Sequence, residues 1–161
     1  MQLATIRAWQ MTRMELGIRT VESIFGLMDD STLARYRDGG TGWTAHQVLG
    51  HLRDFEDVIL TRARLTVNEE NPLLPFPNPD ELAEQRNYHQ IPWRTLLSEW
   101  QQARTEHLTF LAGRSESDWE RPAQHPTRGP FTLHDQIFLT SLHDSLHIEQ
   151  ITRILKEKNA G

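Results

Sequence analysis

The 161-residue chain contains no cysteine, which excludes disulfide bonds, thiol nucleophiles and zinc sites with cysteine ligands. It also has no apolar run near the roughly 18 to 20 residues that a membrane span requires. The N-terminus lacks the basic-then-apolar pattern of a signal peptide, so we expect a cytoplasmic protein without a membrane partner. Any bound metal must be held by His, Asp or Glu, and eight histidines are available.

The chain also lacks a strong excess of charge of one sign, because its formal net charge is only −5 and no long run of like charges occurs. Nucleic-acid binding depends largely on Lys and Arg side chains that neutralise phosphates. We therefore expect a small-molecule substrate and no nucleic acid. Apolar residues make up 37% of the chain, which is enough for a hydrophobic core, and the length suits one domain over residues 1–161.

Four segments show the 3.6-residue periodicity of amphipathic helices. Their approximate bounds are Thr5–Met28, Thr44–Val67, Pro92–Gly113 and Thr132–Lys158. No segment alternates apolar and polar residues as a strand does. The sequence therefore predicts an all-α protein, a four-helix bundle.

Polar residues mark the start of two of these helices. Thr44 and Gln47 fit a capping box, and Thr132 and Asp135 fit a weaker version of it. A long connection of about 25 residues, rich in proline, separates the second and third helices. Within it, Asn78 predicts the cap of a short helix. A connection of this length either forms part of a pocket or is flexible.

Two histidines occupy the inner face of the last predicted helix. His143 and His147 lie about 40° apart around the axis and one turn apart along it. Leu139 and Ile154 share their stripe, so both imidazoles should face the interior. A buried imidazole without a partner costs a few kcal/mol, and a divalent transition metal removes that cost. The spacing matches the half-site of zinc-binding helices, although it also occurs without a metal.

His51 on the second helix supplies the third candidate ligand, because it shares the inward stripe of Phe55. Three histidines from two packed helices leave coordination positions open, which is typical of catalytic rather than structural metal sites. Nearby polar groups are candidates for supporting roles. Asp54 and Asp144 could accept an imidazole N–H or a proton, and Gln150 could orient a ligand or bind substrate.

The remaining polar residues receive simpler interpretations. Glu56 and Glu149 point away from the inward stripes, so we expect both to be solvated. His134 should face outward, and His125 should lie in a loop. His107 is a rival fourth ligand, but a half-buried histidine bonded to a neighbour is the stronger interpretation.

Taken together, these segments resemble the DinB-like superfamily, four-helix metal proteins that include the YfiT-like metal-dependent hydrolases. The matching stretches are Trp43-Thr44 followed by His51-Leu52-x-Asp54-x-Glu56, and His143-Asp144-x-x-His147-x-x-Gln150-Ile151. The order of the motifs and the long connection agree as well. The resemblance implies a nickel or zinc site with His51, His143 and His147 as ligands, often in a homodimer.

The resemblance also implies chemistry that involves a low-molecular-weight thiol. Relatives include bacillithiol S-transferases and a mycothiol-dependent maleylpyruvate isomerase, so our leading hypothesis is a metal-dependent enzyme that transfers a bacillithiol-like thiol to an electrophile. A hydrolase that uses metal-bound hydroxide and a non-catalytic, stress-related metal-binding module stay open. A di-iron bundle is disfavoured, because Phe55 stands where a His-x-x-x-Glu pair would need Glu. A plain bundle with satisfied core histidines is the remaining alternative.

Overall fold

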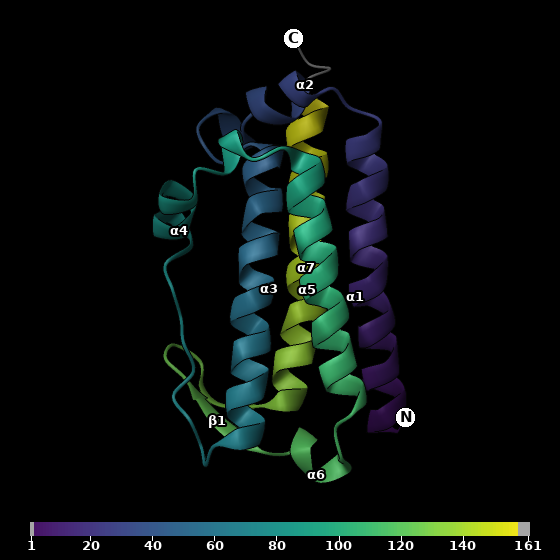
Figure 1. The fold of residues 1–161 in the computed structure, drawn as a ribbon, viewed down its shortest axis with the longest axis vertical. Coiled ribbons are helices and arrows are strands. Elements are labelled where there is room, and N and C mark those ends of the chain that lie inside the picture. Colours follow the sequence, from purple (N-terminus) through teal and green to yellow (C-terminus); the bar gives the residue numbers. More distant parts are fainter. Residues whose placement is uncertain (1, 158–161) are drawn as a thin grey trace.

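Four long helices make up most of the molecule (Figure 1): α1 (Leu3–Gly26), α3 (Ala45–Asn68), α5 (Trp93–Ala112) and α7 (Leu133–Glu157). The computed structural model describes residues 2–157. Helix α3 packs against α5 and α7, and α1 packs against α7 and α5, which closes the bundle. The predicted all-α four-helix bundle is confirmed. The predicted end of the last helix at Lys158 lies outside the described residues.

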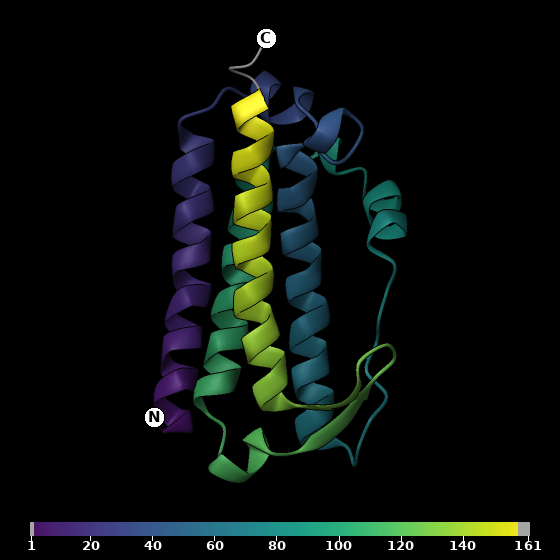
Figure 2. The same cartoon turned by 180° about the vertical axis from the view of Figure 1, so that it is seen from behind.

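The long connection between α3 and α5 changes the order of helix directions. In Figure 1, α1 and α7 run upward, whereas α3 and α5 both run downward. The chain leaves the lower end of α3 and returns to the upper end of the bundle along the outside of α3, through α4 (Pro79–Arg86) and the 3₁₀ turn η2 (Tyr88–Gln90). The connection therefore lies beside α3 over much of its length, as the reverse view also shows (Figure 2).

The predicted helix caps are present. The Thr44 hydroxyl accepts from the backbone N–H of Gln47, and the Gln47 side chain accepts from the N–H of Thr44. Thr132 and Asp135 form the same reciprocal pair at the start of α7. Asn78 caps α4 through the N–H of Asp80. These bonds satisfy backbone donors that the first turn of a helix leaves without partners.

The expectation of no strand is wrong at one place. Strands β1 (Pro122–His125) and β2 (Gly129–Thr132) form an antiparallel hairpin, with Ala123 opposite Phe131. Each strand has only four residues, which is too short for the alternation that identifies a strand in a sequence. The hairpin also bonds to the long connection, because the Leu74 N–H donates to the Gln124 carbonyl at 2.9 Å.

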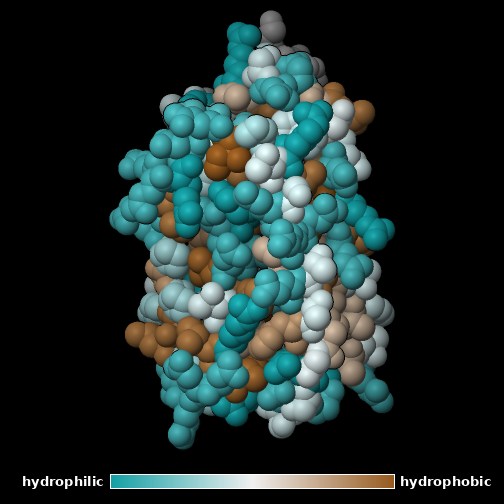
Figure 3. All heavy atoms as spheres, in the orientation of Figure 1, coloured by the Kyte–Doolittle hydropathy of each residue, from teal (hydrophilic) through white to brown (hydrophobic). Residues whose placement is uncertain are grey.

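Three further short elements occur: α2 (Asp30–Arg35), the 3₁₀ turn η1 (Asp38–Gly40) and α6 (Glu116–Trp119). Hydrophilic residues cover most of the face in Figure 3, with smaller hydrophobic groups between them. Among the described residues, no helix is both long and apolar enough to cross a membrane.

The bundle interior contains two main apolar clusters at different heights. One includes Phe25, Leu49 and Trp100 and is the larger; the other includes Met14 and Leu133. Burial of such side chains stabilises the fold by about 25 cal/mol per Å² of apolar surface. The level between the clusters is polar instead. This polar level contains the candidate site.

Candidate metal centre

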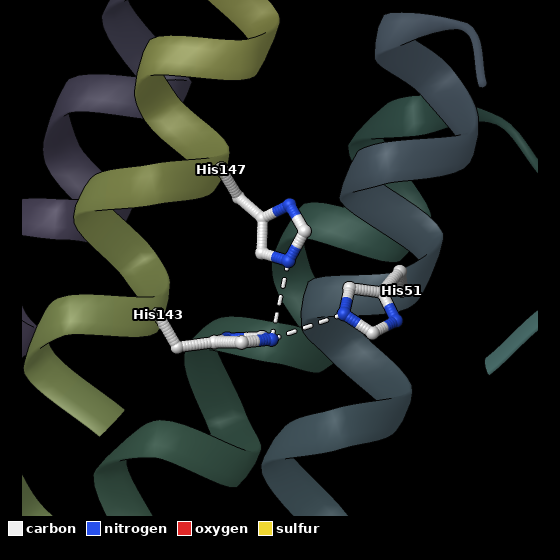
Figure 4. A group of neighbouring side chains, drawn as sticks. All are labelled: His51, His143 and His147. Atoms are coloured by element: carbon white, nitrogen blue, oxygen red, sulfur yellow. Dashed lines mark hydrogen bonds between the residues drawn. The ribbon is translucent and has the colours of Figure 1, made fainter. Parts of the chain in front are cut away.

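Three imidazoles from α3 and α7 converge in the polar level of the bundle (Figure 4). The Nε2 atom of His143 lies 3.0 Å from Nε2 of His51 and 3.1 Å from Nε2 of His147. One ligand atom from each ring lies within 4.8 Å of the others. An ion bonded to imidazole nitrogens at about 2.0–2.1 Å holds neighbouring nitrogens about 3.0–3.4 Å apart. The spacing of the rings therefore fits a shared ion.

Hydrogen bonding alone does not account for these close contacts. The His143 Nε2 atom has a single in-plane position, which holds either a proton or a lone pair. It therefore cannot make regular hydrogen bonds to His51 and His147 at the same time. A metal ion between three lone pairs removes this conflict, so the donor set fits a divalent transition metal.

Protonation of the imidazoles is disfavoured in this environment. Burial lowers the pKa of His51 to about 2, and the neighbouring imidazoles of His143 and His147 act in the same direction. Burial, together with His147, lowers the pKa of His143 to about 3. Burial also lowers the pKa of His147, although its bond to Gln150 opposes the shift. All three rings are therefore neutral near pH 7, the form that binds a metal.

Gln150 fixes which nitrogen of His147 faces the centre. The Gln150 amide donates to Asp38 at 3.0 Å, which leaves its carbonyl oxygen 2.8 Å from Nδ1 of His147. Because that oxygen only accepts, Nδ1 carries the proton and Nε2 presents its lone pair to the centre. Arg153 in turn holds both oxygens of Asp38 at 2.8 Å. The structure thus places Gln150 where it orients His147.

Two aromatic side chains cover the His51 side of the cluster. The Trp43 ring lies 5.0 Å from the His51 ring, measured between centroids, and Phe55 lies 4.4 Å from it. Phe55 also stacks on His143 at 5.4 Å. These contacts hold the imidazoles in place and keep water from this side of the cluster.

Asp54 and Asp144 are buried but bond to other groups than the three histidines. Asp54 accepts from the Tyr88 hydroxyl at 2.8 Å and contacts Arg53 at 2.7 Å, which ties α3 to the long connection. Asp144 accepts from Arg104 at 2.6 and 3.1 Å. Both carboxylates lie close in sequence to the candidate ligand histidines, yet their bonds are to tyrosine and arginine.

The expectation that Glu56 is solvated is wrong. Its side chain is 1% exposed and accepts from Arg104 at 2.5 Å and from Nδ1 of His107 at 2.7 Å. Burial alone would raise the pKa of Glu56, but Arg104 and His107 outweigh it and lower the pKa to about 2. Burial raises the pKa of Asp144 to about 6, against the effect of Arg104. A buried ionic network therefore lies beside the three histidines.

The other histidine predictions have mixed outcomes. His107 is bonded to a neighbour as predicted, but it is fully buried rather than half-buried. His134 faces partly outward and contacts Arg7. His125 lies in β1, not in a loop, and is buried. Glu149 is exposed, as expected.

A cavity of about 210 Å³ opens next to the cluster and has His143 in its wall. Helices α3 and α7, the hairpin and the long connection all contribute to its lining. Two arginines of this lining, Arg62 and Arg128, were not among the residues predicted to form a site. Arg62 follows Phe55 and Ile59 at helical spacing, and a cation on an apolar stripe is the sequence signal that indicates it.

A family model for the DinB superfamily matches residues 13–151. The chain belongs to the DinB superfamily. The resemblance carried by the two histidine motifs is therefore confirmed.

Two curated relatives are similar to this chain along most of their length. A protein of Oceanobacillus iheyensis, described as a "putative metal-dependent hydrolase", is 29% identical over 85% of this chain and 78% of its own. A protein of Geobacillus thermodenitrificans with the same description is 25% identical over 95% of this chain and 85% of its own.

Two solved structures have a fold similar to that of this chain. YfiT from Bacillus subtilis, described as "a probable metal-dependent hydrolase with an unusual four-helix bundle topology", superimposes with a TM-score of 0.87 at 24% identity, over 95% of this chain and 87% of that one. The mycothiol-dependent maleylpyruvate isomerase gives a TM-score of 0.74 at 13% identity, over 94% of this chain but only 61% of that one. These likenesses establish the bundle architecture.

Proposed function

We propose that this protein is a metal-dependent enzyme in which His51, His143 and His147 bind one divalent ion, nickel or zinc. The observation that carries the proposal is the convergence of three neutral imidazoles, with Nε2 separations of 3.0 and 3.1 Å around His143. The descriptions of both curated relatives as metal-dependent hydrolases support it. A small molecule would react in the adjoining cavity.

A divalent ion held by His51, His143 and His147 would supply Lewis acidity, the property that stabilises an anionic nucleophile such as thiolate or hydroxide. The protein supplies position and environment. Gln150 holds His147 in the tautomer that faces the centre. Phe55 and Trp43 cover one side, and the cavity beside His143 admits a second reactant.

The cavity lining favours thiol transfer over hydrolysis. None of the described residues that line it is an aspartate or a glutamate, so a water nucleophile finds no carboxylate base there. A thiol has a pKa near 8.5 and loses its proton more readily. We therefore propose the transfer of a low-molecular-weight, bacillithiol-like thiol to an electrophile. Hydrolysis is the second candidate, because the curated relatives carry that description.

Metal binding is tested by elemental analysis of tag-free protein. We expect about one nickel or zinc ion per chain, and loss of the ion in His147→Ala. Added metal should raise the melting temperature of the wild type but not of this variant, since an ion that binds only the folded state stabilises it. His134→Ala is the matched control on α7 and should keep the metal. Metal lost equally from both variants, or absent from the wild type, would refute the site.

The reaction is tested with the metal-loaded protein and two substrates. Bacillithiol with 1-chloro-2,4-dinitrobenzene reports thiol transfer, and p-nitrophenyl acetate reports hydrolysis. We expect thiol transfer that requires the metal and disappears in His147→Ala. If ester hydrolysis shows this dependence on the metal and on His147 instead, the proposed reaction is hydrolysis and not thiol transfer. If the protein binds metal but catalyses neither reaction, it is a non-catalytic metal-binding module. The homodimer stays a prediction, which sedimentation velocity tests.

A further inference from the structure

The lining of the cavity beside His143 combines apolar side chains with two arginines and a glutamine. Most of its lining is apolar, with Phe55 and Ile59 from α3, Phe131 from β2 and Leu139 from α7. A lining of this kind suits a hydrocarbon or aromatic group, which gains about 25 cal/mol for each Å² removed from water. The polar groups in the lining therefore determine which molecules with an apolar body bind in the cavity.

Arg62 is the first of these polar groups. Its side chain is 92% buried, since only 8% is exposed. The Nε atom donates to the Pro75 carbonyl at 2.8 Å, but the buried Nη2 atom has no partner among the described residues. Burial and the nearby Arg128 both lower the pKa of Arg62, to about 10. Among the described residues no carboxylate offsets these two effects, so within that part of the chain the guanidinium is a buried cation without a counter-charge.

Arg128 brings a second cation to the same cavity. Its Nη1 atom lies 3.1 Å from Nε2 of His125. The Arg128 side chain is exposed, and this imidazole contact does not neutralise its charge. Among the described residues, no carboxylate forms an ion pair with Arg128.

Gln136 also lines the cavity, and its side chain carries an unused acceptor. The Thr66 hydroxyl donates to the Arg62 carbonyl at 2.9 Å, so its oxygen can only accept from Gln136, whose Nε2 lies 2.7 Å away. This bond fixes the amide orientation and leaves the buried Oε1 atom without a partner. Buried polar groups are normally paired. Two unpaired groups of opposite type in one cavity indicate a ligand that satisfies both.

We propose that this cavity binds a small organic acid, whose carboxylate pairs with Arg62 and Arg128 while its apolar body packs against Phe55 and Phe131. A hydroxyl, amine or thiol of the same molecule would donate to Gln136. A carboxylate fits better than a phosphate dianion, because only one of the two cations is buried and the walls are otherwise apolar. The identification of this acid as a reactant rests on the proposed function; the binding itself does not.

The test compares two probes of nearly the same size and shape, the anion hexanoate and the neutral amide hexanamide. Their dissociation constants are measured by NMR titration at pH 7 on protein treated with EDTA, so that no metal contributes. We expect the acid to bind at least about tenfold more tightly than the amide, the size of one charge-assisted hydrogen bond. Arg62→Leu should abolish this preference and leave hexanamide affinity nearly unchanged.

Matched variants separate recognition from folding. Arg64→Leu removes an exposed arginine two residues along α3, paired with Glu106, and should keep the full preference. Arg62→Lys keeps the positive charge and should retain part of the preference for hexanoate. Arg128→Leu should weaken the preference without removing the bond of Arg62 to the long connection. Circular dichroism confirms the fold of each variant.

Other results would overturn the proposal. Equal affinity of the acid and the amide would remove it, as would a preference that survives in both Arg62→Leu and Arg128→Leu. A preference that appears only after metal loading would assign the carboxylate to the metal. Tighter binding of hexyl phosphate than of hexanoate, with the same dependence on Arg62, would replace the carboxylate by a phosphate. Absence of a metal in the metal analysis would refute the proposed function and leave the binding result intact.

Discussion

Replacing Arg104 by methionine tests the energetics of the polar level. Arg104 is 2% exposed and donates to Glu56, to Asp144 and to the Met14 carbonyl. Methionine is apolar and of similar volume, so Arg104→Met leaves two buried carboxylates without their cation. Removing one partner from a buried ion network typically costs about 3–5 kcal/mol.

That cost has a measurable thermal counterpart. For a chain of this size, 1 kcal/mol shifts the melting temperature by about 2–4 °C, so Arg104→Met should melt about 6–20 °C below the wild type. Thermal denaturation followed by circular dichroism measures the melting temperature, and urea denaturation measures the free energy of unfolding. The triple variant Arg104→Met, Glu56→Gln, Asp144→Asn removes the charges together and should recover part of the loss.

The loss should depend on pH in a defined direction. Without Arg104, desolvation raises the pKa values of Glu56 and Asp144 above their values in the unfolded chain. A carboxyl whose folded pKa is raised loses stability as the pH rises through that pKa. The destabilisation of Arg104→Met should therefore be larger at pH 8 than at pH 5. A loss under about 1 kcal/mol, or one that is larger at pH 5, would refute the reasoning.

Two further substitutions test contacts near the histidines. Gln150→Leu removes the acceptor that orients His147, so metal affinity should fall by about 10–100-fold in a competition titration with a fluorescent chelator; unchanged affinity would show that Gln150 does not position this ligand. Gly50→Ala would place a Cβ 2.3 Å from Cγ of Tyr88, so unfolding free energy should fall by about 1–3 kcal/mol. Gly26→Ala, with nothing within 4 Å of the added carbon, is its control and should change stability little.

The fold was predictable from the sequence where the residues of a single helix determine its position and its ends. The apolar periodicity located the four long helices, and local bonds at Thr44, Thr132 and Asn78 located their caps. The inward orientation of His51 and His143 was predictable for the same reason, and the family resemblance implied that the two residues share a site. Both the hairpin and the directions of the helices depend instead on contacts between distant segments, such as the bond of Leu74 to Gln124.

The buried ionic network shows where one-dimensional reasoning fails. Periodicity predicts a solvated Glu56, because this residue lies off the stripe that His51 and Phe55 share on α3. In the structure that side of α3 faces α5 rather than solvent, and Arg104 and His107 of α5 meet it there. A helix inside a bundle contacts two neighbours, so it has two buried stripes. Periodicity centred on one of them misassigns polar residues on the other.

The position of the network gives it a structural role beyond charge neutralisation. Arg104 joins Glu56 on α3 to Asp144 on α7, and these helices carry all three candidate ligands. Glu56 follows His51 by five residues, and Asp144 is adjacent to His143. An apolar layer would stabilise the bundle at least as well, because burial of ions costs free energy. Apolar contacts, however, tolerate small axial shifts between helices. Fork-shaped bonds from one arginine to two carboxylates restrict such shifts, so we infer that this network helps to fix the relative height of α3 and α7 at which Nε2 of His51 lies 3.0 Å from Nε2 of His143.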